Sequence, residues 1–229
     1  MTQPDSTPDL TTCLLARGHD WLAINKPAGI GMHSEDDVAG LVVQASNAFG
    51  QPLWPVHRLD KVTSGVLLLA TSASGAARLS ALFAGHKIRK YYRAQSHSRP
   101  QKKQGWIKGD MSKGRNGSWL LQRSQNNPAI TRLLSGYDEA THTRTFLLQP
   151  LTGRTHQLRV AMKSLGSPID GDARYGGTVA DRTYLHAAAL CWDDEQPDGS
   201  VQRMELTCSP ASGHWVSIAA DWEKPWLLF

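Results

Sequence analysis

The sequence has no apolar run near the length of about 18 residues that a membrane-spanning helix requires. Its first residues, MTQPDSTPDLTT, lack a basic start followed by an apolar stretch, so we expect no secretory signal there. We interpret residues 1–12 as a disordered lead and residues 13–229 as one domain. With 229 residues, of which 40% are hydrophobic and 20% charged, the chain has the composition of an ordinary globular protein.

Cysteine is scarce, because Cys13, Cys191 and Cys208 are the only three in the chain. An odd number without paired spacing predicts neither a disulfide framework nor a zinc site. Unpaired cysteines are typical of a reducing compartment, so we expect a cytoplasmic protein.

Negative charge is in the minority, because 20 acidic residues stand against 25 Lys and Arg and leave a net charge of +5. Much of the basic charge lies in two adjoining stretches, 87–93 and 99–115, where aromatic side chains stand between the basic ones. A charge run by itself usually indicates a solvated surface loop. Basic residues interleaved with aromatics favour phosphate contact combined with base stacking.

Most of the chain has the pattern of short strands between Gly, Pro, Asn and Asp clusters. Strands are predicted at 13–17, 21–25, 56–59, 66–70, 88–94, 118–122, 130–135, 144–149 and 201–207. Helical periodicity predicts three helices, at 38–49, at 74–85 with Ser74 as the N-cap, and at 155–166 with Thr155 as a possible cap. The stretch 96–117 is polar enough to be a long mobile loop. This pattern favours a single α+β domain built on an antiparallel sheet.

Asp60 is a lone carboxylate in the turn-like stretch HRLDKVTSG. Aspartate commonly closes a turn through its own side chain, so this stretch alone favours a structural role. If the stretch is a strand, Arg58 and Asp60 point to the same face, because residues two apart share a face.

The longer stretch HRLDKVTSGVLLLA resembles the signature of the RluA family of pseudouridine synthases. Four further stretches resemble motifs of that family in the same order: INKPAGIGMH at 24–33, KYYRA at 90–94, LTGRTHQLRVAMKSLGSPIDGDARYG at 151–176 and YLHAAAL at 184–190. One short motif is weak support, whereas five in order make the resemblance specific.

The resemblance implies the pseudouridine synthase fold, an α+β fold whose mixed, mostly antiparallel central sheet is flanked by helices and loops. It also implies an isomerase that converts a specific uridine in structured ribosomal or transfer RNA to pseudouridine, with no metal and no other cofactor. RNA is then the expected partner. We expect no membrane association, no obligate protein partner and a monomer.

For the chemistry, the resemblance implies Asp60 as the catalytic carboxylate and Arg159 as its partner. It implies Tyr92 as the active-site tyrosine that stacks on the target base, and a role of Tyr92 in proton transfer stays open. The uracil must leave the sugar at its ring nitrogen, turn, and rejoin through a ring carbon. A carboxylate can act as nucleophile at the anomeric carbon or as base at the neighbouring sugar carbon, and both roles stay open. Burial alone raises the pKa of an acid, and a neighbouring guanidinium counters this effect.

A uridine inside folded RNA must first be taken out of its stack. We expect His57 or a basic loop side chain to fill the gap that it leaves, and the 102–115 stretch to hold the RNA backbone through charge. The residues expected to contact RNA are His57, Arg58, Lys90, Lys102, Lys103, Lys108 and Arg154.

Two other functional classes stay open, a non-catalytic RNA-binding module of the same fold and a glycoside or nucleoside hydrolase. A hydrolase generally uses two cooperating carboxylates. The motifs offer one strong candidate, Asp60, because Asp170 and Asp172 in the Pro-Ile-Asp-Gly-Asp turn are interpreted as architectural. His57, His156 and His186 have no metal-ligand spacing, which favours ordinary hydrogen-bonding roles.

The chain departs from the family pattern near both ends. We see no room for an S4-like RNA-binding domain before Cys13, and CWDDEQPDGS replaces the family's His-Pro pair after the Leu-His-Ala strand. The final ADWEKPWLLF is expected to pack back on the domain or to form a contact. These departures leave the identity of the RNA open.

Overall fold

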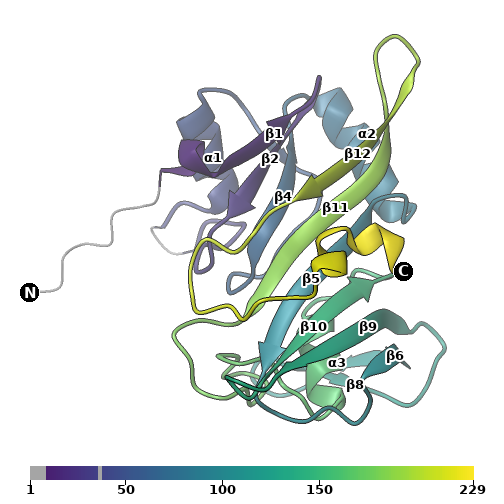
Figure 1. Cartoon of the computed structure of the whole chain (residues 1–229). Helices are drawn as coiled ribbons and strands as arrows, with labels where there is room; N and C mark the ends of the chain where they lie inside the picture. Colours follow the sequence, from purple (N-terminus) through teal and green to yellow (C-terminus); the bar gives the residue numbers. More distant parts are fainter. Residues whose placement is uncertain (1–8, 36–37) are drawn as a thin grey trace, which may run out of the picture.

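The computed structural model describes residues 9–35 and 38–229 (Figure 1). The predicted disordered lead therefore lies largely outside the described residues, and its last part is ordered. Asp9 caps the short 3-10 helix η1 (Leu10–Cys13), and Leu10 is 2% exposed. Ordered structure begins before the predicted boundary because the Leu10 side chain fills a place in the core.

A ten-stranded mixed sheet forms the centre of the fold (Figure 1). In spatial order its main path is β1 (Leu14–Arg17), β2 (Trp21–Lys26), β4 (Ser64–Ala70), β11 (Leu185–Glu195), β5 (Arg89–Ser96), β10 (Thr143–Pro150), β9 (Ala129–Asp138) and β6 (Gln104–Gly109). Two further strands join it, β3 (Trp54–Pro55) on β4 and β12 (Val201–Thr207) on β11. Among the described strands only β4 and β11 run parallel. The mixed, mostly antiparallel sheet predicted for this chain is confirmed.

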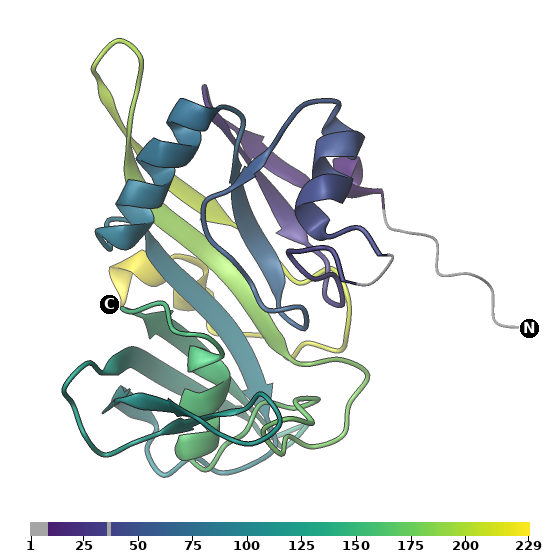
Figure 2. The ribbon, with the colours of Figure 1, turned by 180° about the vertical axis from the view of Figure 1, so that it is seen from behind.

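Three α-helices pack against the sheet, α1 (Leu41–Phe49), α2 (Ala73–Ala84) and α3 (Gln157–Ser164). Figure 2 shows α2 and α3 on the same side, over the upper and lower parts of the sheet. Because side chains alternate along a strand, β5, β10, β9 and β6 present one apolar face to α3. That face includes Tyr92, Phe146, Leu133 and Ile107.

The opposite face of β5, β10 and β9 is covered by the C-terminal segment, residues 220–229 (Figure 1). This segment contains two short 3-10 helices, η2 (Ala220–Glu223) and η3 (Pro225–Leu227). Trp222, Trp226 and Phe229 pack against Tyr91 and Leu147. The final ADWEKPWLLF was expected either to pack back on the domain or to form a contact, and in the structure it packs back on the domain.

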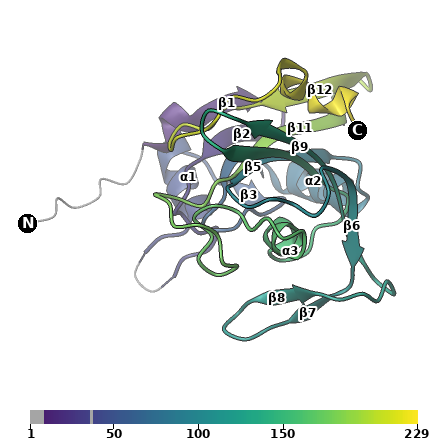
Figure 3. The same ribbon diagram turned by 60° about the horizontal axis from the view of Figure 1, so that its bottom comes forward.

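The stretch 96–117, predicted to be a mobile loop, instead contains β6 and the strand β7 (Met111–Lys113). β7 pairs with β8 (Trp119–Leu121) in a hairpin that lies below α3 (Figure 3). The hairpin contacts the body of the protein through β8, where Leu121 packs against the core and the Trp119 N–H donates to the Tyr175 hydroxyl at 3.1 Å. The prediction was wrong because β6 is an edge strand with one solvated face, so its polar residues alternate with few apolar ones.

Three local predictions also need correction. Residues 56–59 are not a strand, because 56–57 form a bend and 58–60 have no regular structure, so the alternation argument for Arg58 and Asp60 does not apply. The N-cap of α2 is Ser72, whose hydroxyl accepts from the Gly75 N–H, and not Ser74. The N-cap of α3 is His156, in the left-handed conformation, and not Thr155. None of the helices in the described part of the chain is both long and apolar enough to cross a bilayer.

Candidate active site

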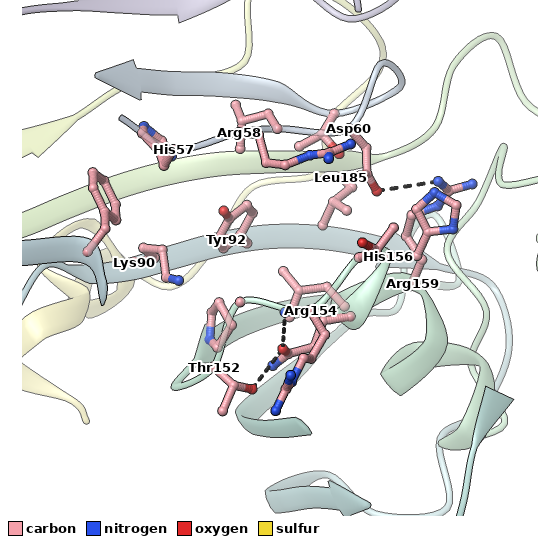
Figure 4. A pocket seen from close by; sticks show the side chains of 18 of the residues that line it. His57, Arg58, Asp60, Lys90, Tyr92, Thr152, Arg154, His156, Arg159 and Leu185 are labelled. Atoms are coloured by element: carbon pink, nitrogen blue, oxygen red, sulfur yellow. Dashed lines mark hydrogen bonds and ion pairs between the residues drawn. The ribbon is translucent and has the colours of Figure 1, made fainter. Parts of the chain in front are cut away.

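A cavity of about 470 Å³ opens where the 56–63 segment, β5, α2 and the start of α3 meet. Seven of the ten residues predicted to act on RNA line it (Figure 4). They are His57, Arg58, Asp60, Lys90, Tyr92, Arg154 and Arg159. The structure therefore gathers into one place residues from sequence segments more than 90 residues apart.

Asp60 lies at the start of a tight turn, and the buried Lys26 stabilises this turn through hydrogen bonds to backbone carbonyls. The carbonyl of Asp60 accepts from the Thr63 N–H at 3.0 Å. The Lys26 ammonium is 0% exposed and donates to the carbonyls of Pro27 at 2.7 Å and Thr63 at 2.9 Å. Burial lowers the pKa of Lys26 to about 7, and the charge of Asp60 opposes that shift. No role was predicted for Lys26, although it lies in the INKPAGIGMH motif.

Arg159 reaches Asp60 from α3, and its side chain is 6% exposed. Its Nη1 donates to Oδ2 of Asp60 at 3.4 Å (Figure 4). Its Nε and Nη2 donate to the two carboxylate oxygens of Asp172 at 2.7 and 2.8 Å. Burial disfavours the charged guanidinium, but the hydrogen bonds and charges of the two carboxylates outweigh it and raise the pKa of Arg159. Asp172 is thus a partner that the sequence analysis missed.

Tyr92 forms an aromatic wall of the cavity from β5, and the residue is 9% exposed. Burial raises the pKa of its phenol, and the negative charge of Asp60 raises it further. The phenol is therefore protonated at neutral pH. A flat, neutral ring beside a carboxylate suits the stacking of a base.

The turn that precedes α3 is held by the buried amide of Gln157. Its Oε1 accepts from the Thr152 hydroxyl at 2.7 Å and from the Arg154 N–H at 3.0 Å (Figure 4). His156 caps the helix with φ 57° and places Nδ1 2.8 Å from the Tyr175 hydroxyl. Burial lowers the pKa of His156 while the charge of Asp60 opposes the shift, so a neutral ring lines the cavity.

Three cationic side chains surround the opening. Arg58 is exposed and extends along the cavity wall toward Asp60 (Figure 4). Lys90 lines the wall opposite, and burial lowers the pKa of its ammonium. Arg154 is exposed and donates to the backbone and side-chain carbonyls of Asn127. The opening is therefore positively charged, as binding of a phosphate backbone requires.

His57 lines the cavity, but its ring is held in place by contacts within the protein. Its Nε2 accepts from the Leu68 N–H at 2.9 Å, and the ring stacks on Phe83 at 4.3 Å between centroids. Burial, assisted by the charge of Lys90, lowers the pKa of His57 to about 3. A ring held in this way does not suit the predicted role of moving into the gap left in the RNA.

The structure does not bring Lys102, Lys103 and Lys108 to the cavity. Lys108 lies 5.0 Å from the Trp106 ring centroid, and Lys102 donates to the Trp106 carbonyl. Trp106 and Lys108 alternate with Ile107, which packs on the α3 side, so their side chains point to the face of the sheet that the C-terminal segment covers. Of the two basic stretches, 87–93 therefore contributes Lys90 to the cavity, whereas Lys108 of the 99–115 stretch lies on the other face of the sheet.

The site has the parts of a reaction on a nucleobase. It offers one carboxylate beside a fixed guanidinium, an aromatic platform and a cationic opening. The described residues contain no group of three or more His, Cys, Asp or Glu side chains arranged to hold a metal ion. A second carboxylate does exist nearby, but Asp172 is 1% exposed and occupied by Arg159, so it cannot cooperate with Asp60 on a substrate.

Comparison with known proteins identifies related chains. The family model for RNA pseudouridylate synthase matches residues 20–164. A Haemophilus influenzae protein named "Uncharacterized RNA pseudouridine synthase" is 49% identical over 209 residues, which are 90% of this chain and 88% of that one. The ribosomal large subunit pseudouridine synthase C of Rickettsia bellii is 33% identical over 187 residues, 77% of this chain. The present chain spans 62% of the length of that Rickettsia protein.

Solved structures agree with this likeness. The human RNA pseudouridylate synthase domain containing 1 protein superposes with a TM-score of 0.74 at 26% identity and covers 99% of this chain and 98% of its own. The human domain containing 4 protein gives a TM-score of 0.69 at 26% identity, over 88% of this chain and 90% of its own.

Proposed function

This chain belongs to the RNA pseudouridylate synthase family, and from that premise we propose that it isomerises a specific uridine in structured RNA through the carboxylate of Asp60. One observation carries the assignment of the residue. Asp60 faces a cavity that also holds Tyr92, and a buried guanidinium lies 3.4 Å from its Oδ2 atom. A carboxylate held beside a fixed positive charge is favoured in its ionised form.

In the reaction, the bond between the uracil ring nitrogen and the anomeric carbon breaks. The Asp60 carboxylate either attacks the anomeric carbon or takes a proton from the neighbouring sugar carbon. The released uracil turns, and one of its ring carbons bonds to the anomeric carbon. In the first route the ester bond between Asp60 and the anomeric carbon breaks as this bond forms, and in the second route Asp60 returns the proton to the neighbouring sugar carbon. The ring carbon then loses its proton, and the ring nitrogen released from the sugar gains one. Tyr92 holds the uracil by stacking during this rotation.

RNA approaches through the cationic opening formed by Arg58, Lys90 and Arg154. The target uridine leaves its stack, at a cost of a few kcal/mol, and enters the cavity. Arg58 is exposed and makes no ion pair with Asp60, so its side chain is available to the RNA. Phosphates are held by charge at Lys90 and Arg154.

Ribosomal RNA is the first substrate to test, because several relatives are named ribosomal large subunit pseudouridine synthase C. Transfer RNA is the second. We place the protein in the cytoplasm as a monomer. The free thiols of Cys13, Cys191 and Cys208 support the reducing compartment.

The test is to add the protein to RNA from cells that lack it, and to measure pseudouridine and free uracil by mass spectrometry of the nucleosides. Pseudouridine without free uracil supports the isomerase. Free uracil indicates a hydrolase, and the absence of both products indicates an RNA-binding module.

Asp60→Asn is expected to abolish turnover and to leave RNA affinity within about a few-fold, because the amide keeps the shape and loses the charge. Asp138→Asn, at the end of β9 and not among the residues that line the cavity, is the control.

A further inference from the structure

We infer that Asp172 is a positioning residue for the reaction, which fixes the guanidinium of Arg159 in the orientation that Asp60 requires. This inference rests on the proposed function, in which Asp60 reacts with the sugar. Asp172 does not line the cavity, so it acts only through Arg159.

The three contacts of Arg159 are unequal. Asp172 accepts two short hydrogen bonds, at 2.7 Å from Nε and 2.8 Å from Nη2, which together form a bidentate pair. Asp60 accepts a single bond of 3.4 Å from Nη1. A bidentate pair between a planar guanidinium and a carboxylate is both strong and directional. The orientation of the guanidinium is therefore set by Asp172, and Asp60 meets the one nitrogen that Asp172 leaves free.

Burial strengthens this assignment. The side chains of Arg159 and Asp172 are 6% and 1% exposed, whereas that of Asp60 is 19% exposed. Water therefore competes for the contact with Asp60 and hardly at all for the contacts with Asp172. The buried pair persists when substrate enters the cavity, and Asp60 stays free to move and react.

The turn that carries Asp172 is rigid because two backbones meet closely there. Gly171 has φ 74°, and a Cβ at this position would lie 1.8 Å from the carbonyl oxygen of Arg182. The N–H groups of Tyr175 and Gly177 donate to the carbonyl of Asp172 at 3.1 and 2.9 Å. No larger side chain fits at Gly171, so the turn holds Asp172 in one place.

The planar face of the Arg159 guanidinium is also in contact, in addition to the edge that Asp172 binds. Its central carbon lies 5.0 Å from the ring centroid of Tyr175, which follows Asp172 in the same turn. Asp172 therefore supports the edge of the group and Tyr175 supports its face. One short segment behind the cavity controls how Arg159 faces Asp60.

The same turn supplies a matched control. Asp170 is also buried, with a side chain 4% exposed, and it also accepts hydrogen bonds. Its partners are the backbone N–H and Nδ1 of His97, at 3.1 and 2.8 Å. Replacing Asp170 disturbs the turn to a similar degree without removing a partner of Arg159.

The experiment uses the full chain in excess over total RNA from cells that lack it, and follows pseudouridine formation in a single turnover. The maximal rate and the half-saturating protein concentration are measured for the parent, Asp172→Asn and Asp170→Asn. Asp172→Asn is expected to lower the maximal rate by about 10- to 100-fold, because a displacement of about 1 Å has that effect. The half-saturating concentration should change by less than about threefold, and Asp170→Asn should keep the maximal rate within about threefold.

A double-variant cycle separates positioning from general damage. In an Arg159→Gln background, Asp172→Asn should cause no further loss of rate, because its effect passes through the missing guanidinium. A full-rate Asp172→Asn, an equal loss in Asp170→Asn, or losses that multiply in the double variant would each overturn the inference. If Asp172→Asn does not fold, Asp172→Glu keeps the buried charge but displaces the carboxylate. A full rate in that variant would also overturn it.

Asp60→Asn is assayed beside these variants so that the two proposals fail separately. An active Asp60→Asn rejects the proposed chemistry itself. An inactive Asp60→Asn together with a fully active Asp172→Asn rejects only the role given to Asp172.

Discussion

The Nη1 atom of Arg159 lies 3.4 Å from Oδ2 of Asp60, although the two residues are 99 positions apart in the chain. One comes from α3 and the other from the segment after β3. The pair joins two halves of the site that no local element connects. The sheet must therefore be folded for the two side chains to meet. The contacts around the pair lead to the following predictions.

Arg159→Gln is expected to lower the free energy of unfolding by about 3–5 kcal/mol, because it leaves the buried Asp172 carboxylate without its cation. Urea denaturation measures this loss. Asp60→Asn should change the same free energy by less than about 1 kcal/mol, since Asp60 is more exposed and makes a longer contact. Equal losses in both variants would contradict the unequal sharing of Arg159.

Tyr92→Phe and Tyr92→Ala distinguish stacking from proton transfer. Because the phenol is protonated at neutral pH, we expect Tyr92→Phe to keep RNA affinity and at least about a tenth of the turnover rate. Tyr92→Ala removes the stacking surface and should weaken binding by about 1–3 kcal/mol. Single-turnover rates and filter binding measure both. Loss of turnover in Tyr92→Phe at unchanged affinity would instead assign the hydroxyl to proton transfer.

The neutral His57 predicts an acid-sensitive contribution to stability. Its pKa is lowered to about 3 in the folded protein from an ordinary 6.5, so the unfolded chain binds more protons between these values. This contribution is complete above pH 6.5 and falls by up to about 1.4 kcal/mol per pH unit as the pH decreases toward 3. His57→Asn does not titrate, so the parent should lose stability relative to it between pH 7.5 and 4.5. A constant difference across that range in urea denaturation would show that His57 is not buried as a neutral acceptor.

Two sets of three Gln substitutions test where RNA lies, because each set removes three positive charges. The cavity set is Arg58, Lys90 and Arg154. The β6 set is Lys102, Lys103 and Lys108. We expect the cavity set to weaken RNA binding more and to reduce the slope of log affinity against log salt by about 2, because its side chains surround the opening. A larger effect of the β6 set would mean that RNA wraps around the edge strand to the opposite face.

The strand pattern was predicted well where apolar residues form a run or alternate with polar ones, and poorly where they do neither. The runs at 66–70 and 201–207 became β4 and β12 with nearly the predicted bounds. β6 and β7 were missed because edge strands keep a solvated face and carry little periodicity. Residues 56–59 were predicted as a strand because Val56 and Leu59 stand in a short segment before a turn. The strand in this region is β3, which contains only Trp54 and Pro55.

The same division holds for the site. Motif order in the sequence pointed to Asp60, Tyr92 and Arg159, and the structure places all three at one cavity. Lys26 and Asp172 were missed as parts of that site. Their signal in the sequence is a charged residue in or beside a turn motif, and this signal is the same whether the side chain is solvated or buried.

The sequence by itself determined the family, the mixed antiparallel sheet and the catalytic candidates, because motif residues and apolar periodicity are local properties of the chain. Only the tertiary structure decided the partners. It gave Arg159 a second carboxylate, that of Asp172. It also showed that the His57 ring accepts from the Leu68 N–H and that Lys108 lies on the face of the sheet away from the cavity. Whether a charged side chain is solvated, ion-paired or buried depends on its burial and on which remote segments lie next to it. Spacing along the chain gives neither of these.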